Sequence, residues 1–359
     1  MTYRHLMTLA GMVALWCGIW ACQPNEAGGS EPTPEPTTPG FKPTPMAWNK
    51  PANFPEPAYN LAKNPVTVQG FALGRALFYD GLLSHDGTVS CGFCHQPSAA
   101  FAHTDHALSH GIRDQIGTRN VPAIQNVAWQ REFFWDGGVQ DLDLLPISPI
   151  QNPVEMGDTL ANVLAKLRKD PQYPGLFEAA FGTKEINTER MMKALSQFMV
   201  TLVSANSRYD KAVRGEGPAL NDTETRGLTV FKAKCASCHA TDLFTDGSFR
   251  NNGLPRIPTA KVDDIGRGAI SLNPADRYKF RVPSLRNVER TPPYMHDGRF
   301  WTLEQVLTHY ASGITDSPTL DPALKSGFTL TRQEQTDLIA FLRTLTDTEF
   351  LSDRRFMPN

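Results

Sequence analysis

Apolar side chains recur at helical spacing in two similar segments, residues 195–202 and 338–345. Apolar residues three and four positions apart lie on one face of an α-helix, so each segment predicts a helix that packs on a core. The two segments also match each other, which indicates an internal repeat. The matching pairs are Phe198 and Phe341, Thr201 and Thr344, and Leu202 and Leu345.

The repeat extends upstream of each predicted helix. Residues 74–78 and 227–231 share a glycine and a terminal phenylalanine, and each precedes a Cys-x-x-Cys-His run. This self-similarity predicts two domains of one architecture. Residues 206–221 are rich in glycine and charge, which is typical of a linker between domains. Short helices and long loops elsewhere predict a mostly α fold.

A third helix is predicted to begin after Thr302. Thr302 and Gln305 have the spacing of a capping box, in which the two side chains bond to each other's backbone N–H groups. Beyond it, Leu303, Leu307 and Tyr310 lie on one helix face with Val306. His309 points about 100° away from that face.

The composition fits two folded domains. The chain has 359 residues, of which 40% are hydrophobic, and its net charge is −2. A nearly neutral chain lacks the basic surface that binds nucleic acid, so no nucleic-acid partner is expected.

The N-terminus predicts export. The apolar stretch 6–21 is too short to span a membrane comfortably and is typical of a secretory signal, so residues 1–22 are interpreted as a signal peptide. Cys22 is a candidate lipidation site, with ordinary signal cleavage as the alternative. Periplasmic location is expected, with membrane contact only through that lipid anchor.

Residues 23–58 are rich in proline and threonine and are predicted to form an unfolded tether. The folded domains are then assigned to residues 59–205 and 206–359.

Two Cys-x-x-Cys-His runs carry the chemistry. Two thiols three positions apart can bond the two vinyl groups of one haem, and the adjacent histidine can bind its iron. Two such runs predict two covalent c-type haems and electron transfer between them. The attachment and ligand residues are Cys91, Cys94, His95, Cys235, Cys238 and His239.

The alternative for these cysteines is a zinc site built from two Cys-x-x-Cys knuckles. Such knuckles normally lie within about 20 residues of each other, whereas these runs lie far apart. The other two cysteines, Cys17 and Cys22, lie in the signal region, so no pair remains for a disulfide.

Six further segments resemble the bacterial di-haem cytochrome c peroxidase family, which includes MauG and MbnH. The resemblance runs from about residue 60 to the C-terminus. It implies two cytochrome c-like haem domains packed against each other with long loops, the N-terminal haem being peroxidatic and the C-terminal haem serving as electron donor or store. The segments are 73–80, 117–122, 134–137, 152–157, 281–287 and 293–298.

The resemblance implies Tyr310 as the distal ligand of the second haem. Counting from His296, Tyr310 occupies the position where the peroxidases of the family have a methionine, and this is the MauG and MbnH pattern. An anionic phenolate favours oxidised iron more than a thioether does. Without the resemblance, Tyr310 would be interpreted as a core aromatic and His309 as the better ligand candidate.

The resemblance also places Glu155 and Pro149 over the distal face of the first haem. A buried carboxyl group there could move the peroxide proton, although a lone glutamate is more often solvated. Pro149 matches a proline that crowds this face. Leu145 departs from the family pattern, which commonly has glutamine, so one distal hydrogen bond is missing or comes from another residue.

Two more residues have roles implied by the resemblance. His110 lies in the loop where many peroxidases carry a histidine that caps the first haem, and the alternative is a solvated loop histidine. Trp135 would lie between the haems and relay electrons, whereas an aromatic run of this kind is usually core packing.

A calcium ion between the domains is implied as well. Its ligands would be Asn120 and the backbone carbonyls of Thr291 and Pro293, because calcium prefers hard oxygen donors. Taken alone, Asn120 would be a turn residue.

Three functions remain open. The first is a peroxidase that reduces hydrogen peroxide at the first haem, with electrons passed through the second haem from a small periplasmic cytochrome c or copper protein. The second is a MauG- or MbnH-like oxidation of tryptophan or tyrosine in a protein substrate. The third is a non-enzymatic electron carrier, which needs no acid at an open haem face.

Overall fold

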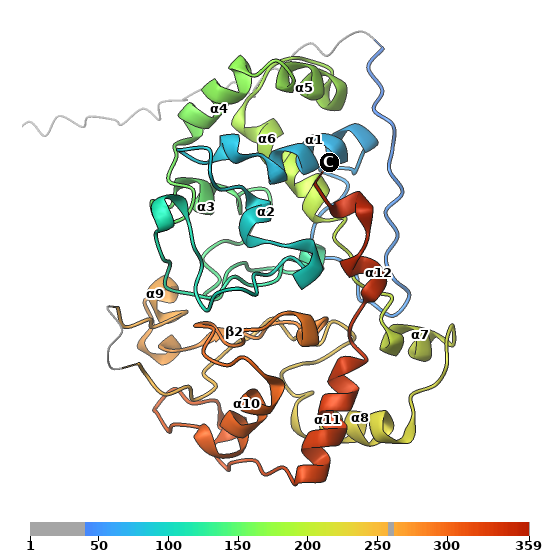
Figure 1. The fold of residues 1–359 in the computed structure, drawn as a ribbon, viewed down its shortest axis with the longest axis vertical. Helices are drawn as coiled ribbons and strands as arrows, with labels where there is room; N and C mark the ends of the chain where they lie inside the picture. Colours follow the sequence, from blue (N-terminus) through green and yellow to red (C-terminus); the bar gives the residue numbers. More distant parts are fainter. Residues whose placement is uncertain (1–39, 258–261, 359) are drawn as a thin grey trace, which may run out of the picture. The chain divides into compact units, whose positions relative to one another are not determined.

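The computed structural model describes residues 40–257 and 262–358 (Figure 1). The predicted signal peptide, the candidate lipidation site Cys22 and the first part of the predicted tether lie outside the described residues. Among the helices that are described, none is both long enough and apolar enough to cross a bilayer.

The described chain is mostly helical, as predicted, with long loops between short helices (Figure 1). The α-helices are α1 (Val68–Tyr79), α2 (Cys91–Cys94), α3 (Ile147–Gln151), α4 (Leu160–Lys169), α5 (Tyr173–Phe181), α6 (Thr188–Met199), α7 (Arg208–Arg214), α8 (Asp222–Lys234), α9 (Gly268–Ser271), α10 (Leu303–Thr308), α11 (Arg332–Arg343) and α12 (Thr348–Leu351). The short 3₁₀ helices are η1 (Gly81–Leu83), η2 (Pro97–Ala99), η3 (Ile112–Asp114), η4 (Val127–Trp129), η5 (Pro274–Asp276), η6 (Val288–Arg290), η8 (Pro322–Leu324) and η9 (Arg354–Phe356). A π-helical turn, η7 (His309–Gly313), follows α10.

The two strands are β1 (Phe249–Arg250) and β2 (Phe280–Arg281). They pair antiparallel, with Phe249 opposite Arg281.

The predicted repeat is present as two helix pairs, α1 with α6 and α8 with α11 (Figure 1). Each pair crosses at a glycine. A Cβ atom on Gly74 would lie 2.0 Å from the carbonyl oxygen of Ala194, and one on Gly227 would lie 1.9 Å from that of Asp337. The helix backbones are therefore in direct contact, and only glycine fits at either crossing.

An aromatic cluster lies beside each crossing. The ring centroids of Phe78 and Phe198 are 5.0 Å apart in the first domain, and those of Phe231 and Phe341 are 5.2 Å apart in the second. A matched pair of phenylalanines therefore packs in each of the two cores.

The two repeated helices end earlier than predicted, at Met199 and Arg343. The matched threonines explain both ends. The Thr201 hydroxyl donates to the carbonyl of Phe198 and the Thr344 hydroxyl to that of Phe341, each at 2.6 Å. These local bonds compete with the next turn of helix, so the last predicted residues lie in a turn.

The predicted linker 206–221 is folded instead. It contains α7, which begins with a capping box of Ser207 and Asp210. Asp210 is fully buried and receives two hydrogen bonds from the guanidinium of Arg286, at 2.7 and 2.8 Å. The charged residues of this stretch indicated a solvated segment. The Asp210 carboxylate instead pairs with Arg286, an arginine far along the chain, inside the protein.

The predicted tether is also shorter than expected, because residues 40–58 pack on the first domain. The Trp48 ring stacks on Trp129 with centroids 5.5 Å apart, and its Nε1 donates to the carbonyl of Val200 at 2.8 Å. Phe54 is buried in the core. A few aromatic residues among the prolines are enough to anchor this stretch.

Replacing either crossing glycine with alanine is expected to destabilise its domain, because the new methyl group meets a backbone carbonyl that cannot move without separating the helices. Gly74→Ala and Gly227→Ala should each lower the free energy of unfolding by about 3 kcal/mol or more. Thermal unfolding monitored by circular dichroism measures the effect.

Gly175→Ala is the matched control, since its Cβ would have no neighbour within 4 Å in α5. This change should be neutral or stabilising by up to about 1 kcal/mol. Equal unfolding temperatures for all three variants would contradict the role of the crossings.

Candidate functional site

The two Cys-x-x-Cys-His runs hold their histidines in the same way. The Nδ1 of His95 lies 2.7 Å from the carbonyl oxygen of Phe101, and the Nδ1 of His239 lies 3.0 Å from that of Phe244. In each case a neutral ring donates from Nδ1 and keeps Nε2 free to bind a metal. Burial lowers the pKa of His95 to about 4. Burial also lowers the pKa of His239, so both rings are held neutral.

The four cysteines of these runs form no disulfide. Burial raises the pKa of Cys91 and of Cys235 to about 12, so these thiols are held in the protonated form. Within the described residues, no three His, Cys, Asp or Glu side chains converge as ligands of a metal ion, which disfavours the zinc alternative. The donor set fits haem c at both runs.

Glu155 lies beside the first run, in the loop after α3. Its backbone carbonyl accepts from Ile112, and its carboxylate accepts a 2.9 Å hydrogen bond from Asn152. Burial and, after it, the nearby Glu155 carboxylate raise the pKa of the Cys94 thiol to about 12. Burial in turn raises the pKa of Glu155, so this glutamate is not a solvated surface residue.

Pro149 and Leu145 come from the segment that precedes Glu155. The carbonyl of Pro149, in α3, accepts a 3.2 Å hydrogen bond from the backbone N–H of Met156. This bond ties α3 to the loop that contains Glu155. Leu145 packs against the hydrophobic core of the first domain. Its aliphatic side chain supplies no hydrogen bond, and Asn152 is the amide that contacts Glu155.

His110 lies in a loop next to the first run, where its backbone carbonyl is 3.4 Å from the Sγ of Cys94. Its ring stacks on His106 with centroids 4.1 Å apart, and His106 lies near His103. The loop is thus close to the first haem position, while the His110 imidazole packs on another histidine.

Tyr310 lies in the π-helical turn η7, near both cysteines of the second run. Burial and these two thiols raise the pKa of Tyr310 to about 12. The capping box of Thr302 and Gln305 is formed as predicted and begins α10. A π turn in place of regular helix is common at functional sites.

His309, the alternative ligand, is engaged elsewhere. Its Nε2 lies 3.1 Å from the backbone carbonyl of Asn252, and its Nδ1 side faces Gly313. Sequence reasoning missed Asn252, which bonds to His309 through its backbone and interacts with the Tyr310 hydroxyl through its side chain. The only sequence signal was the turn-forming run 251–253.

Trp135 lies where the two domains meet. Its Nε1 donates to the carbonyl of Asn120 at 2.9 Å, and its own carbonyl accepts from the backbone N–H of Arg281 at 2.7 Å. The indole is thus tied to a segment of the first domain, and the Trp135 backbone is tied to strand β2 of the second.

Asn120 is buried and contacts His296, which lies three residues after Pro293 of the expected calcium site. Its backbone N–H donates to the carbonyl of His296 at 2.7 Å, and its side-chain amide donates to Ala107.

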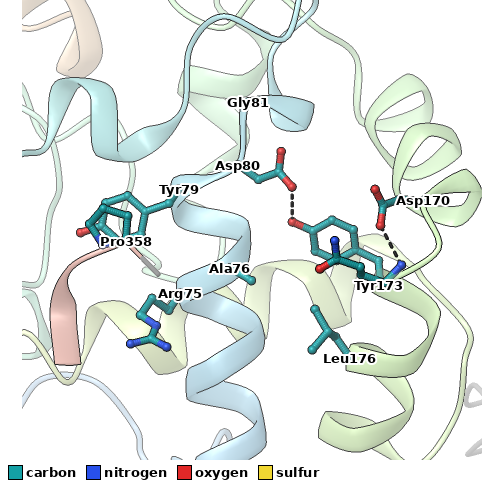
Figure 2. Close-up of a pocket in the computed structure, with 10 residues that line it drawn as sticks. Arg75, Ala76, Tyr79, Asp80, Gly81, Asp170, Tyr173, Leu176 and Pro358 are labelled. Carbon is teal, nitrogen blue, oxygen red and sulfur yellow. Dashed lines mark hydrogen bonds between the residues drawn. The ribbon is translucent and has the colours of Figure 1, made fainter. Parts of the chain in front are cut away.

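A pocket of about 340 Å³ lies between α1 and α5, outside this site (Figure 2). Figure 2 shows the Tyr173 hydroxyl directed at Asp80, to which it donates at 2.6 Å. None of the residues predicted to act on haem or peroxide lines this pocket.

The fold and the two histidine sites define a class of protein, the di-haem c-type cytochromes. Residues 68–217 match the family model for di-haem cytochrome c peroxidase, and residues 224–346 match that for cytochrome c. MauG of Methylorubrum extorquens is 38% identical, over 83% of each chain. Cytochrome c551 peroxidase of Nitrosomonas europaea is 34% identical, over 79% of this chain and 82% of that protein. The chain belongs to the di-haem cytochrome c peroxidase family.

A solved structure agrees with this assignment. The crystal structure of a MauG-like protein associated with microbial copper homeostasis superimposes with a TM-score of 0.78 at 35% identity, over 87% of this chain and 99% of that one. The predicted family, the fold of two cytochrome c-like domains and the two haem c groups are confirmed, and the protein is an oxidoreductase. The roles of single residues stay predictions.

Tyr310→Phe is expected to change the second haem, since it removes the only oxygen that this side chain can offer to iron. The visible and electron paramagnetic resonance spectra of the ferric protein should lose the low-spin signal of that haem. His309→Ala is the control and should retain it, because His309 is engaged by Asn252. Loss of the signal in His309→Ala alone would identify histidine as the ligand.

Glu155→Gln is expected to slow the reaction with hydrogen peroxide by about 10²- to 10⁴-fold, the usual contribution of a general acid–base group. Since burial raises the pKa of Glu155, its ionised form appears only above the ordinary glutamate range, and the rate should rise with pH through this raised value. Stopped-flow rates across pH measure both effects. Glu178→Gln, on the surface of α5, is the control, and an unchanged pH profile in Glu155→Gln would exclude the role.

Proposed function

We propose that the protein is a di-haem c-type peroxidase that reduces hydrogen peroxide at the His95 haem. Two electrons pass through the His239 haem from a small periplasmic cytochrome c or copper protein, and two protons from solvent complete the conversion of peroxide into two water molecules. The single observation that carries this proposal is Glu155, a carboxyl group of raised pKa that lies beside the first Cys-x-x-Cys-His run.

Haem c bound at His95 would supply a redox-active iron that exchanges electrons with peroxide. Glu155 accepts a proton from peroxide and returns it to the oxygen that leaves as water. Asn152 orients the carboxylate through the 2.9 Å hydrogen bond, and Pro149 limits the space over the haem. An electron carrier would need none of these groups, so the non-enzymatic hypothesis leaves their arrangement unexplained.

Trp135 is proposed as the relay between the two haems. Its indole Nε1 donates to Asn120 in the first domain, its backbone carbonyl accepts from Arg281 in the second, and an aromatic ring at this contact shortens the distance that each electron must cross. A calcium ion at Asn120, Thr291 and Pro293 would hold the same two segments together.

A second function is favoured by Tyr310. A phenolate ligand stabilises oxidised iron, which suits the withdrawal of electrons from tryptophan or tyrosine in a partner protein. Relatives named MauG and the MauG-like structure associated with copper homeostasis support this candidate. Both functions use peroxide at the first haem and differ in the source of electrons.

The cellular location of the protein is proposed from the haem-attachment runs and the N-terminal sequence. Covalent haem attachment and the apolar N-terminal stretch suit export to the periplasm, with Cys22 as the candidate lipid anchor.

Peroxide-dependent oxidation of reduced cytochrome c by the purified protein tests the proposal. Turnover that depends on both proteins and on peroxide is expected from the peroxidase, whereas peroxide consumption without cytochrome c oxidation supports a protein substrate. No reaction with peroxide, in either the resting or the half-reduced protein, would leave only the electron carrier.

Paramagnetic resonance of the resting protein tests His110: one high-spin signal means an open first haem, and two low-spin signals mean that His110 caps it.

Trp135→Phe is expected to uncouple the haems while both remain attached, because phenylalanine is much harder to oxidise than tryptophan. Electron transfer between the haems after flash or stopped-flow reduction should slow by at least tenfold. Trp129→Phe is the control, since the Trp129 ring packs on Trp48 and Phe54 and its Nε1 donates to the carbonyl of Pro55. Wild-type equilibration between haems in Trp135→Phe would refute the relay.

A further inference from the structure

Two cationic side chains are buried in the described part of the chain, Arg281 and Arg286, and only one of them has a counter-ion. Arg286 is 1% exposed and forms a bidentate salt bridge with Asp210. Arg281 is 6% exposed and forms no salt bridge with a described residue. Its side chain donates from Nε to the backbone carbonyl of Phe134, at 3.1 Å.

The nearest acid does not neutralise Arg281. Glu132 is the carboxylate whose field reaches this guanidinium, but its Oε1 is bound to Arg267 at 2.7 Å. Asp136, in the same loop, is bound to Arg119. Burial accordingly lowers the pKa of Arg281 to about 10. A buried cation without a partner costs several kcal/mol, so proteins pair such groups with an anion.

The position of Arg281 suggests where that anion comes from. Arg281 ends strand β2, two residues before Pro283, whose backbone carbonyl interacts with the ring of His239. Arg281 also bonds through its backbone to Trp135. Arg281 therefore lies in a stretch that contacts the second proximal histidine, through Pro283, and Trp135, through the Arg281 backbone.

Haem c carries two propionate groups, which are carboxylates at one edge of the ring. A planar guanidinium matches a carboxylate with two parallel hydrogen bonds, and Arg286 with Asp210 shows that geometry in this protein. A propionate of the second haem would supply the charge and the acceptors that Arg281 lacks.

We propose that Arg281 is the counter-ion of a propionate of the second haem and fixes that edge of the haem beside Trp135. The side chain thus has two effects. It neutralises a buried carboxylate, and it adds positive charge near the iron, which favours the reduced state. The inference depends on haem attachment at Cys235 and Cys238 and is independent of which reaction the enzyme catalyses.

The test compares Arg281→Gln with Arg281→Lys in the full di-haem protein. Pyridine haemochrome spectra first establish that two haems remain per chain. Spectroelectrochemical titration should then show that Arg281→Gln shifts the equilibrium for reduction of the second haem at least tenfold toward the oxidised form, which is 59 mV for one electron. Arg281→Lys should restore most of this shift, because it retains the charge.

Arg277→Gln is the matched control. It removes a charge from an exposed arginine in the segment that leads into β2 and should leave both potentials unchanged. An unchanged second potential in Arg281→Gln, or a shift confined to the first haem, would overturn the proposal. A wild-type protein without haem at either Cys-x-x-Cys-His run would instead contradict the prediction of two covalent haem c groups.

Resonance Raman spectra of the wild-type protein provide an outcome that does not depend on a variant folding. A propionate that accepts hydrogen bonds from a guanidinium should show a shift of its bending band when water is replaced by deuterium oxide. The shift should persist in Arg281→Lys. Absence of any exchange-sensitive propionate band in the wild type would also overturn the proposal.

Discussion

Two hydrogen bonds between an imidazole and a backbone carbonyl determine the rest of the site. The bond from His95 to Phe101 and the bond from His239 to Phe244 each fix one ring nitrogen, and so present the other to iron. Each acceptor carbonyl belongs to a phenylalanine that packs in the aromatic cluster of its domain. The position of each iron ligand is therefore set by the helix crossing at Gly74 or Gly227, because that crossing positions the cluster.

The domain contact gives the two sites different roles. On one side, Glu155 is half-buried near Cys94 and has a raised pKa, which suits proton transfer at an open haem face. On the other side, Tyr310 lies close to both cysteines of the second run and suits a closed haem that stores or passes electrons. Trp135 is fixed between them, and Arg281 brings an unpaired positive charge to the same place. Repetition of one fold thus allows one site for peroxide and one for electrons.

Sequence patterns predicted what depends on local spacing. The attachment runs, the repeated glycines and phenylalanines, and the capping box at Thr302 each act within a few residues, and the structure contains all of them. Features that depend on distant partners were not predictable. Asp210 lay in a predicted linker, since the local sequence does not reveal its pairing with the distant Arg286. Residues 40–58 were predicted to form a tether, since the local sequence does not reveal that their aromatic residues bury against helices beyond residue 120. Asn252 has no motif, and only the fold brings it to His309 and Tyr310.

The central claim is that two unequal haem sites respond to peroxide as one unit. Anaerobic titration of the purified protein with hydrogen peroxide, monitored at the absorption bands of both haems, tests it most directly. The account predicts two haems per chain and a change at both sets of bands that is complete with one equivalent of peroxide. A preparation with one haem per chain, or a change limited to one set of bands at every peroxide concentration, would contradict it.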